Sequence, residues 1–218
     1  MLSKRGAERL TGIMLGVSVF LMLAHVAADV ALGHGRVSVV LILLYGFPAG
    51  LAGSALYITF RRHDPTLAMF SGFCFAGHGL LMVLTAVVLL VGLRFPDEFA
   101  LYGAEPNSLT GMASSLELTM DKIGKTAFAS LGLGLNLFGL LILMSGALPR
   151  WIGWLGFSVG ISGFVVSLAG LTDLFVRATT ELMVGITTLA SLVFMLILGL
   201  CLAFREIQEA RESQTAYG

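Results

Sequence analysis

Ionisable side chains inside long apolar stretches are the first candidates for chemistry in this sequence. His25 and Asp29 are four residues apart, so one helix would place both on the same face. His78 lies near the middle of a separate apolar stretch. An ionisable group within a membrane-spanning helix is costly, and such a group is by default a functional candidate. These three side chains are therefore where we first look for a bound group.

The two histidines lead to a cofactor hypothesis. The rise along the helix axis from the inner end of each span places His25 at roughly 22 Å and His78 at roughly 19 Å. Both imidazoles could therefore lie at the same depth in the membrane. Imidazoles ligate haem iron and divalent metals, and a carboxylate such as Asp29 commonly orients a ligating imidazole. The hypothesis is cofactor binding by His25 and His78, either to haem b or, with Asp29, to a divalent metal. The competing interpretation pairs His25 with Asp29 and lets His78 hydrogen-bond a neighbouring helix.

Sequence motifs of enzymes give no support to a catalytic role. The chain contains no H-E-x-x-H motif and no G-x-S-x-G motif, so no catalytic residue is proposed. Thirteen Lys and Arg balance thirteen Asp and Glu, which argues against nucleic acid as a partner attracted by positive charge. The expected partner is the lipid bilayer.

Composition and apolar runs predict the fold class. Of 218 residues, 57% are hydrophobic and 12% charged, and the mean hydropathy is +0.93. A soluble domain carries about a quarter charged residues. A helix needs roughly 20 apolar residues to cross a bilayer. We expect an all-α polytopic membrane protein, one transmembrane domain over residues 1–218 with six helices in a compact bundle. The expected spans are residues 10–32, 37–60, 66–93, 124–148, 151–172 and 181–204.

The long connection between the third and fourth spans is expected to form an outer interfacial helix over residues 95–123. Its polar side leads to Glu117, Asp121 and Lys125 at intervals of four residues. Asp121 with Lys125 is an attractive pair at this spacing, whereas Glu117 with Asp121 is repulsive. The segment is then either a solvated helix face that leads into the fourth span or a lid over the outer ends of the spans.

A second outer group surrounds Arg177. Asp173 and Glu181 each lie four residues from it, which predicts an ion-paired turn if the segment is helical. Together with the charges above, these residues form a predicted polar outer cluster consisting of Asp29, Asp121, Lys125, Asp173 and Arg177.

The distribution of positive charge predicts the orientation. Six spans place both termini on one side, and that side holds eight of the thirteen Lys and Arg residues. The positive-inside rule then predicts a multi-pass protein of the bacterial cytoplasmic (plasma) membrane with cytoplasmic N- and C-termini.

Glycine spacing predicts close helix packing. The chain has 27 glycines, and three pairs inside the spans have the G-x-x-x-G spacing that lets helices approach closely. The spacing does not say whether the close partner is in the same chain or in another. The pairs are Gly12 with Gly16, Gly46 with Gly50, and Gly156 with Gly160.

The inner connection before the fifth span carries a resemblance to a known family. Residues 148–156 read Leu-Pro-Arg-Trp-Ile-Gly-Trp-Leu-Gly, in which Arg150 obeys the inside rule and Trp151 and Trp154 suit the headgroup level. The stretch resembles the "PRW-x-GW-x-G" segment that opens the fifth helix in an uncharacterised bacterial family, domain of unknown function 4386. The resemblance implies a six-helix plan over the whole chain and brings no established reaction.

Three functional interpretations remain open at this point. The first is a non-enzymatic accessory, scaffold or regulatory membrane component that associates with other membrane subunits or with itself. The second is a haem- or metal-binding membrane protein that uses His25 and His78. The third is a small-molecule or lipid carrier with a cavity beneath the helix that runs from Glu117 to Lys125.

Overall fold

A computed structural model describes residues 4–32, 35–101, 106–174 and 177–215. These ranges form six α-helices, and they contain no strand. All six helices are long and apolar enough to cross a membrane, which confirms the predicted all-α polytopic fold. The helices are α1 (Lys4–Leu32), α2 (Arg36–Phe60), α3 (Pro65–Leu101), α4 (Pro106–Ser145), α5 (Arg150–Leu171) and α6 (Arg177–Thr215).

Proline and aspartate define where two of the helices begin. The carboxylate of Asp64 accepts the backbone N–H groups of Thr66 and Leu67, each at 2.9 Å, and so caps the start of α3. Pro65 stands at the first helical position, where a missing N–H costs nothing. Pro149 is the N-cap residue of α5, and its carbonyl oxygen accepts the N–H of Ile152 at 3.0 Å. The short connections between spans are thereby fixed at this end of the bundle.

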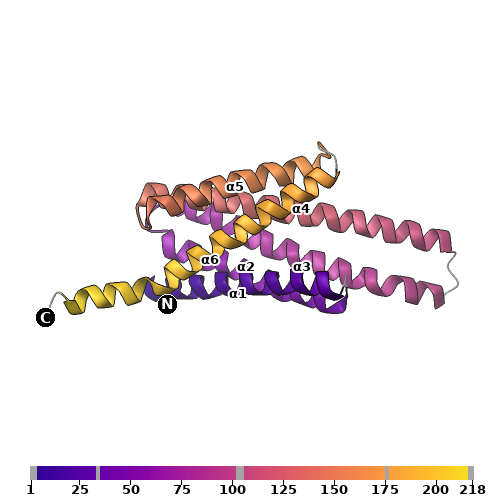
Figure 1. Cartoon of the computed structure of the whole chain (residues 1–218), viewed down its shortest axis with the longest axis horizontal. Coiled ribbons are helices and arrows are strands. Elements are labelled where there is room, and N and C mark those ends of the chain that lie inside the picture. Colours follow the sequence, from indigo (N-terminus) through magenta and orange to yellow (C-terminus); the bar gives the residue numbers. More distant parts are fainter. Residues whose placement is uncertain (1–3, 33–34, 102–105, 175–176, 216–218) are drawn as a thin grey trace.

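The six helices are arranged in a ring. Each helix packs against its neighbours in the chain, and α1 packs against α6 to complete the ring. Both termini lie at the same end (Figure 1), which we call the proximal end. The distal end is the opposite one, where α1, α3 and α5 finish and α2, α4 and α6 begin.

Large aromatic side chains fill the proximal half of the ring. The rings of Phe60 on α2 and Phe138 on α4 meet edge to face with centroids 4.9 Å apart. Phe75 on α3 and Phe194 on α6 are also fully buried. Aromatic side chains bury more apolar area than any others, so the interior is closed at this depth.

Glycines allow the closest helix contacts. A Cβ atom placed on Gly12 would lie 2.6 Å from the carbonyl oxygen of Gly199, and one on Gly46 would lie 2.7 Å from that of Gly79. Any larger residue at Gly12 or Gly46 would therefore meet the backbone of the facing helix. A Cβ on Gly16, by contrast, would meet nothing within 4 Å.

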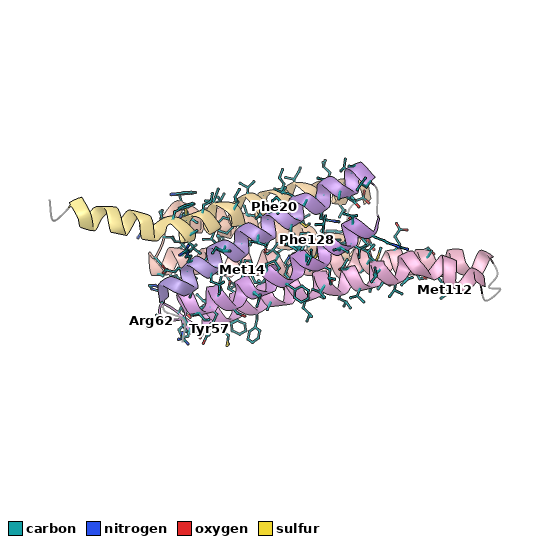
Figure 2. All side chains as sticks on the ribbon, turned by 90° about the horizontal axis from the view of Figure 1, so that it is seen from below. Met14, Phe20, Tyr57, Arg62, Met112 and Phe128 are labelled. Atoms are coloured by element: carbon teal, nitrogen blue, oxygen red, sulfur yellow. The ribbon has the colours of Figure 1, made fainter. Side chains whose placement is uncertain are left out.

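The expected interfacial helix over residues 95–123 is not a separate element, and its second part leads directly into the fourth span. Residues 95–101 prolong α3, and residues 106–123 are the first part of α4. A break at each end would leave backbone N–H and C=O groups to be capped, whereas a continuous helix satisfies them internally. The resulting hairpin of α3 and α4 projects beyond the other helices, with Met112 on its projecting part (Figures 1 and 2).

Candidate functional site

His78 is completely buried between three helices. Its Nδ1 lies 2.9 Å from the carbonyl oxygen of Ala127 on α4, and its Nε2 lies 2.7 Å from the hydroxyl of Tyr45 on α2. A carbonyl oxygen only accepts, so Nδ1–H donates to Ala127 and the neutral ring's Nε2 accepts from Tyr45. Both ring nitrogens therefore have partners within the bundle.

Two serines continue this polar contact along α3 and α4. The Ser71 hydroxyl donates to the carbonyl oxygen of Gly134 at 3.0 Å, and the Ser130 hydroxyl donates to that of Cys74 at 2.9 Å. With the bond from His78, three side-chain hydrogen bonds cross this interface at successive turns. Such bonds hold neighbouring membrane helices in register. His78 thus has a structural role in holding α2, α3 and α4 together.

His25 belongs to a different group at the distal end. Its Nδ1 lies 2.8 Å from the hydroxyl of Ser38 on α2, and that hydroxyl lies 3.1 Å from the carboxylate of Asp29. Ser38 has one proton, which it donates to Asp29, so it accepts the N–H of His25. Ser38 thereby joins two polar residues of α1 to α2. The pairing of His25 with Asp29, one of the two alternatives from the sequence, does not include Ser38, whose only signal in the sequence is its place in the first turn of the facing helix.

The described contacts do not fit a haem or metal shared by His25 and His78. The two imidazoles have separate partners, and neither ring nitrogen of His78 is open to a metal. In the part of the chain that the structure describes, no group of three or more His, Cys, Asp and Glu side chains is arranged to hold a metal ion.

A cavity of about 740 Å³ occupies the distal end of the ring. Every one of the six helices contributes to its lining, together with the turn between α5 and α6. The wall on the proximal side of the cavity is apolar, and the wall on the distal side is polar and charged. The lining residues are His25, Ser38, Val39, Ile42, Leu89, Ser114, Glu117, Leu118, Met120, Asp121, Lys125, Gly170, Asp173 and Thr180.

Two ion pairs border this cavity. Lys125 donates to Asp121 one helical turn earlier at 2.6 Å, which confirms the predicted pair. Lys122 donates to both carboxylate oxygens of Asp173, at 2.9 and 3.1 Å, and to the carbonyl oxygen of Leu171 at 3.0 Å. Lys122 therefore satisfies the end of α5 and ties it to α4.

Asp173 has an unusual backbone conformation. Its φ of 51° lies in the left-handed region, at the position after a helix end that glycine usually occupies. The Leu174 N–H closes the turn by donating to the carbonyl oxygen of Ala169 at 3.0 Å. The hydrogen bond from Lys122 and the charge of Lys122 hold the pKa of Asp173 below its ordinary value. The backbone conformation alone would favour glycine here. Aspartate occupies the position because its carboxylate pairs with Lys122.

The expected helical ion-paired turn around Arg177 is therefore wrong for Asp173. Helix α5 ends at Leu171 and α6 begins at Arg177, so Asp173 and Arg177 do not share a helix. Asp173 pairs instead with Lys122 on α4. The side chain of Arg177 lies outside the described residues.

Glu117 adds negative charge that no neighbouring cation balances. Among the described residues it forms no hydrogen bond or ion pair, whereas Asp121 and Asp173 each face a lysine. The cavity and its border thus contain three carboxylates and two ammonium groups, those of Lys125 and Lys122. The carboxylate of Glu117 is therefore the negative charge that remains unbalanced there.

The predicted interface anchors lie at the proximal end, at the start of α5. Arg150 is exposed, and Trp151 and Trp154 are each more than half exposed. The ring of Trp154 packs edge to face on Phe157 with centroids 6.1 Å apart. Amphipathic rings at this level suit the boundary between hydrocarbon and water.

These features define a polytopic helical membrane protein with a polar cavity at one end. A family model described as "Domain of unknown function (DUF4386)" matches residues 24–205, and the chain belongs to this family. No curated protein and no solved structure matches the chain.

Proposed function

We propose that this chain is a non-enzymatic membrane component that binds an amphipathic molecule carrying a positive charge in the distal cavity. The observation that carries the proposal is the cavity itself. Its volume of about 740 Å³ falls within the range of roughly 300–1,000 Å³ that is typical of small-molecule sites. A mainly apolar lining with a few polar groups is also typical of such sites.

The two kinds of wall suit the two parts of an amphipathic molecule. Val39 and Ile42 on α2 and Leu89 on α3 offer apolar contact on the proximal side of the cavity. Glu117 offers a carboxylate on the distal side, on the projecting part of α4. A hydrocarbon group in the proximal part and an ammonium group near Glu117 would satisfy both walls, because burying apolar area is favourable and a cation is attracted to the carboxylate.

The closed proximal half supports binding rather than conduction. Phe60 and Phe138 meet across the interior on the proximal side, so the cavity has no opening toward the proximal end in this conformation. A molecule that enters from the distal side would stop above this aromatic layer. The proposed role is therefore that of a receptor, a regulator or the ligand-holding state of a carrier.

The positive-inside rule supports placing the distal end outside the cell. We propose that the protein lies in a bacterial cytoplasmic membrane with both termini inside, since the inner side holds eight of the thirteen Lys and Arg residues. The cavity then faces the exterior and the outer leaflet.

Binding of charged and neutral amphiphiles to protein in lipid nanodiscs tests the proposal. Radiolabelled dodecylamine is expected to bind saturably above the level in empty nanodiscs, and dodecanol more weakly. Glu117→Gln is expected to weaken dodecylamine binding about fivefold, the effect of one exposed ion pair, and to leave dodecanol unchanged. Glu8→Gln removes the same charge at the proximal end and serves as the control. If neither dodecylamine nor dodecanol binds saturably, the proposal is contradicted.

A scaffold or accessory role is the second candidate, and the projecting hairpin of α3 and α4 favours it (Figure 1). A hairpin that extends past the bundle offers a surface to another membrane subunit or to a second copy. The mass of the particle in mild detergent tests this role. A monodisperse monomer with no co-purifying chain would count against it.

A further inference from the structure

One face of α1 changes from buried to exposed along its length. Positions three or four residues apart form the row that faces α6, starting at the contact between Gly12 and Gly199. Val19 in this row is 4% exposed, whereas Leu23 is 48%, Val26 46% and Val30 84% exposed. Contact with α6 therefore covers only the proximal half of this face.

Helix α6 shows the same change. Leu192, Met195 and Leu198 in its proximal part are buried, but no residue from 181 to 190 is buried. A Cβ on Gly185 would meet nothing within 4 Å. Gly185 lies fourteen residues before Gly199, about four helical turns, so it is on the face that turns toward α1.

The distal end of α6 packs against α5 instead. Thr180 is buried, and its methyl group lies close above Gly170. Figure 1 shows α6 crossing obliquely from the proximal end of α1 to the distal end of α5. The ring is thus closed between α1 and α6 in its proximal half and open between them in its distal half. We call this opening the α1–α6 gap, bounded by residues 23–32 and 181–190.

The α1–α6 gap borders the distal cavity. His25 on α1 and Thr180 on α6 both line the cavity, and these residues lie on the two helices that bound the gap. The exposed side chains along the α1 side, Leu23, Val26 and Val30, are all apolar. A sideways path with an apolar wall on α1 therefore runs from the bilayer toward a chamber that contains charged groups.

We infer that the ligand of the distal cavity is a membrane amphiphile that enters sideways from the surrounding leaflet through the α1–α6 gap. Its cationic headgroup and the first part of its hydrocarbon chain lie in the cavity, and the rest of the chain lies in the gap. This inference rests on the proposed function and identifies the source of the ligand. The occupant is a lipid-like molecule because apolar side chains border the path and carboxylates border its end. A water-soluble cation would instead use the distal opening and gain nothing from the gap.

Amines of different chain length and a residue that narrows the gap test this inference. In nanodiscs, Gly185→Trp is expected to weaken dodecylamine binding at least tenfold while butylamine binding changes less than twofold. Ile186→Trp places the same ring at the same depth on the lipid-facing side and is expected to change neither. An unaltered affinity of Gly185→Trp for dodecylamine, or an equal loss for both amines, would overturn the sideways path.

A photoreactive dodecylamine with a diazirine at the chain end gives a second readout on the wild-type protein. Adducts are expected on residues 23–32 and 181–190. Adducts confined to other segments would overturn the inference even if the amine binds saturably, in which case the proposed function survives. Absence of saturable binding by both amines would contradict the proposed function as well.

Discussion

Replacing Gly12 by Ala is expected to strain the contact that closes the ring, whereas the same change at Gly16 is not. The two glycines are one turn apart on α1 and belong to one G-x-x-x-G pair. A Cβ on Gly12 would lie 2.6 Å from the carbonyl oxygen of Gly199 and 2.9 Å from the nitrogen of Ala203, where ordinary contact begins at 3.4 Å. Both are backbone atoms and cannot rotate away, so α1 and α6 must separate.

The expected difference follows from two free-energy terms. Forcing an extra methyl group into a packed contact costs about 1–3 kcal/mol. Exchange of Gly for Ala in a helix gains about 1 kcal/mol in either variant, and this gain cancels when the two are compared. Gly12→Ala is therefore expected to be about 1–3 kcal/mol less stable than Gly16→Ala.

Reversible unfolding in mixed micelles, followed by circular dichroism, measures this difference. Both variants are compared with the wild type under identical detergent conditions. Equal stability of the two variants, or a more stable Gly12→Ala, would refute the assignment of Gly12 to the closing contact.

Three further predictions concern the polar groups. Tyr45→Phe leaves the buried Nε2 of His78 without a donor and is expected to lower the free energy of unfolding by about 1–3 kcal/mol, whereas Tyr57→Phe is expected to have little effect in the same unfolding assay. The pKa of Asp173 is lowered, so its ionised form stabilises the fold above the ordinary value of 3.8, and this stabilisation is lost as the pH falls through the lowered pKa. The melting temperature of the wild type is therefore expected to exceed that of Asp173→Asn near neutral pH and to approach it in strong acid; a constant difference would count against the pair with Lys122. Elemental mass spectrometry is expected to find iron and zinc only well below one equivalent, because both ring nitrogens of His78 are hydrogen-bonded, and a stoichiometric metal would contradict this reading of the histidines.

The fold was predictable because its signal is local. Apolar runs long enough to cross a bilayer are visible without knowledge of any contact, and all six are helices in the structure. The pair of Asp121 with Lys125 was predictable for the same reason, since both residues lie on one helix at a spacing of four. The family was recognised from the stretch around Trp151, and the match over residues 24–205 confirms it.

The site was only partly predictable because its contacts join separate helices. Periodicity on one helix does not show which residue of another helix faces it, so Ser38 was missed as the partner of His25. Asp173 was placed on a helix with Arg177, but its left-handed backbone ends α5 and turns its carboxylate to Lys122. The continuation of α3 to Leu101 and the start of α4 at Pro106 were not visible in the composition, because the breaker residues between the spans predicted a separate helix.

The most direct test of the central claim is to fill the distal cavity and measure binding. Leu118 lines the cavity and is largely exposed, so Leu118→Trp is expected to reduce the cavity without unfolding the chain. Thr119→Trp places the same ring on the neighbouring residue, which does not line the cavity. In nanodiscs, Leu118→Trp is expected to lower saturable dodecylamine binding at least tenfold, and Thr119→Trp is expected to leave it unchanged. Equal binding by the wild type and both variants would contradict the claim that this cavity is the ligand site.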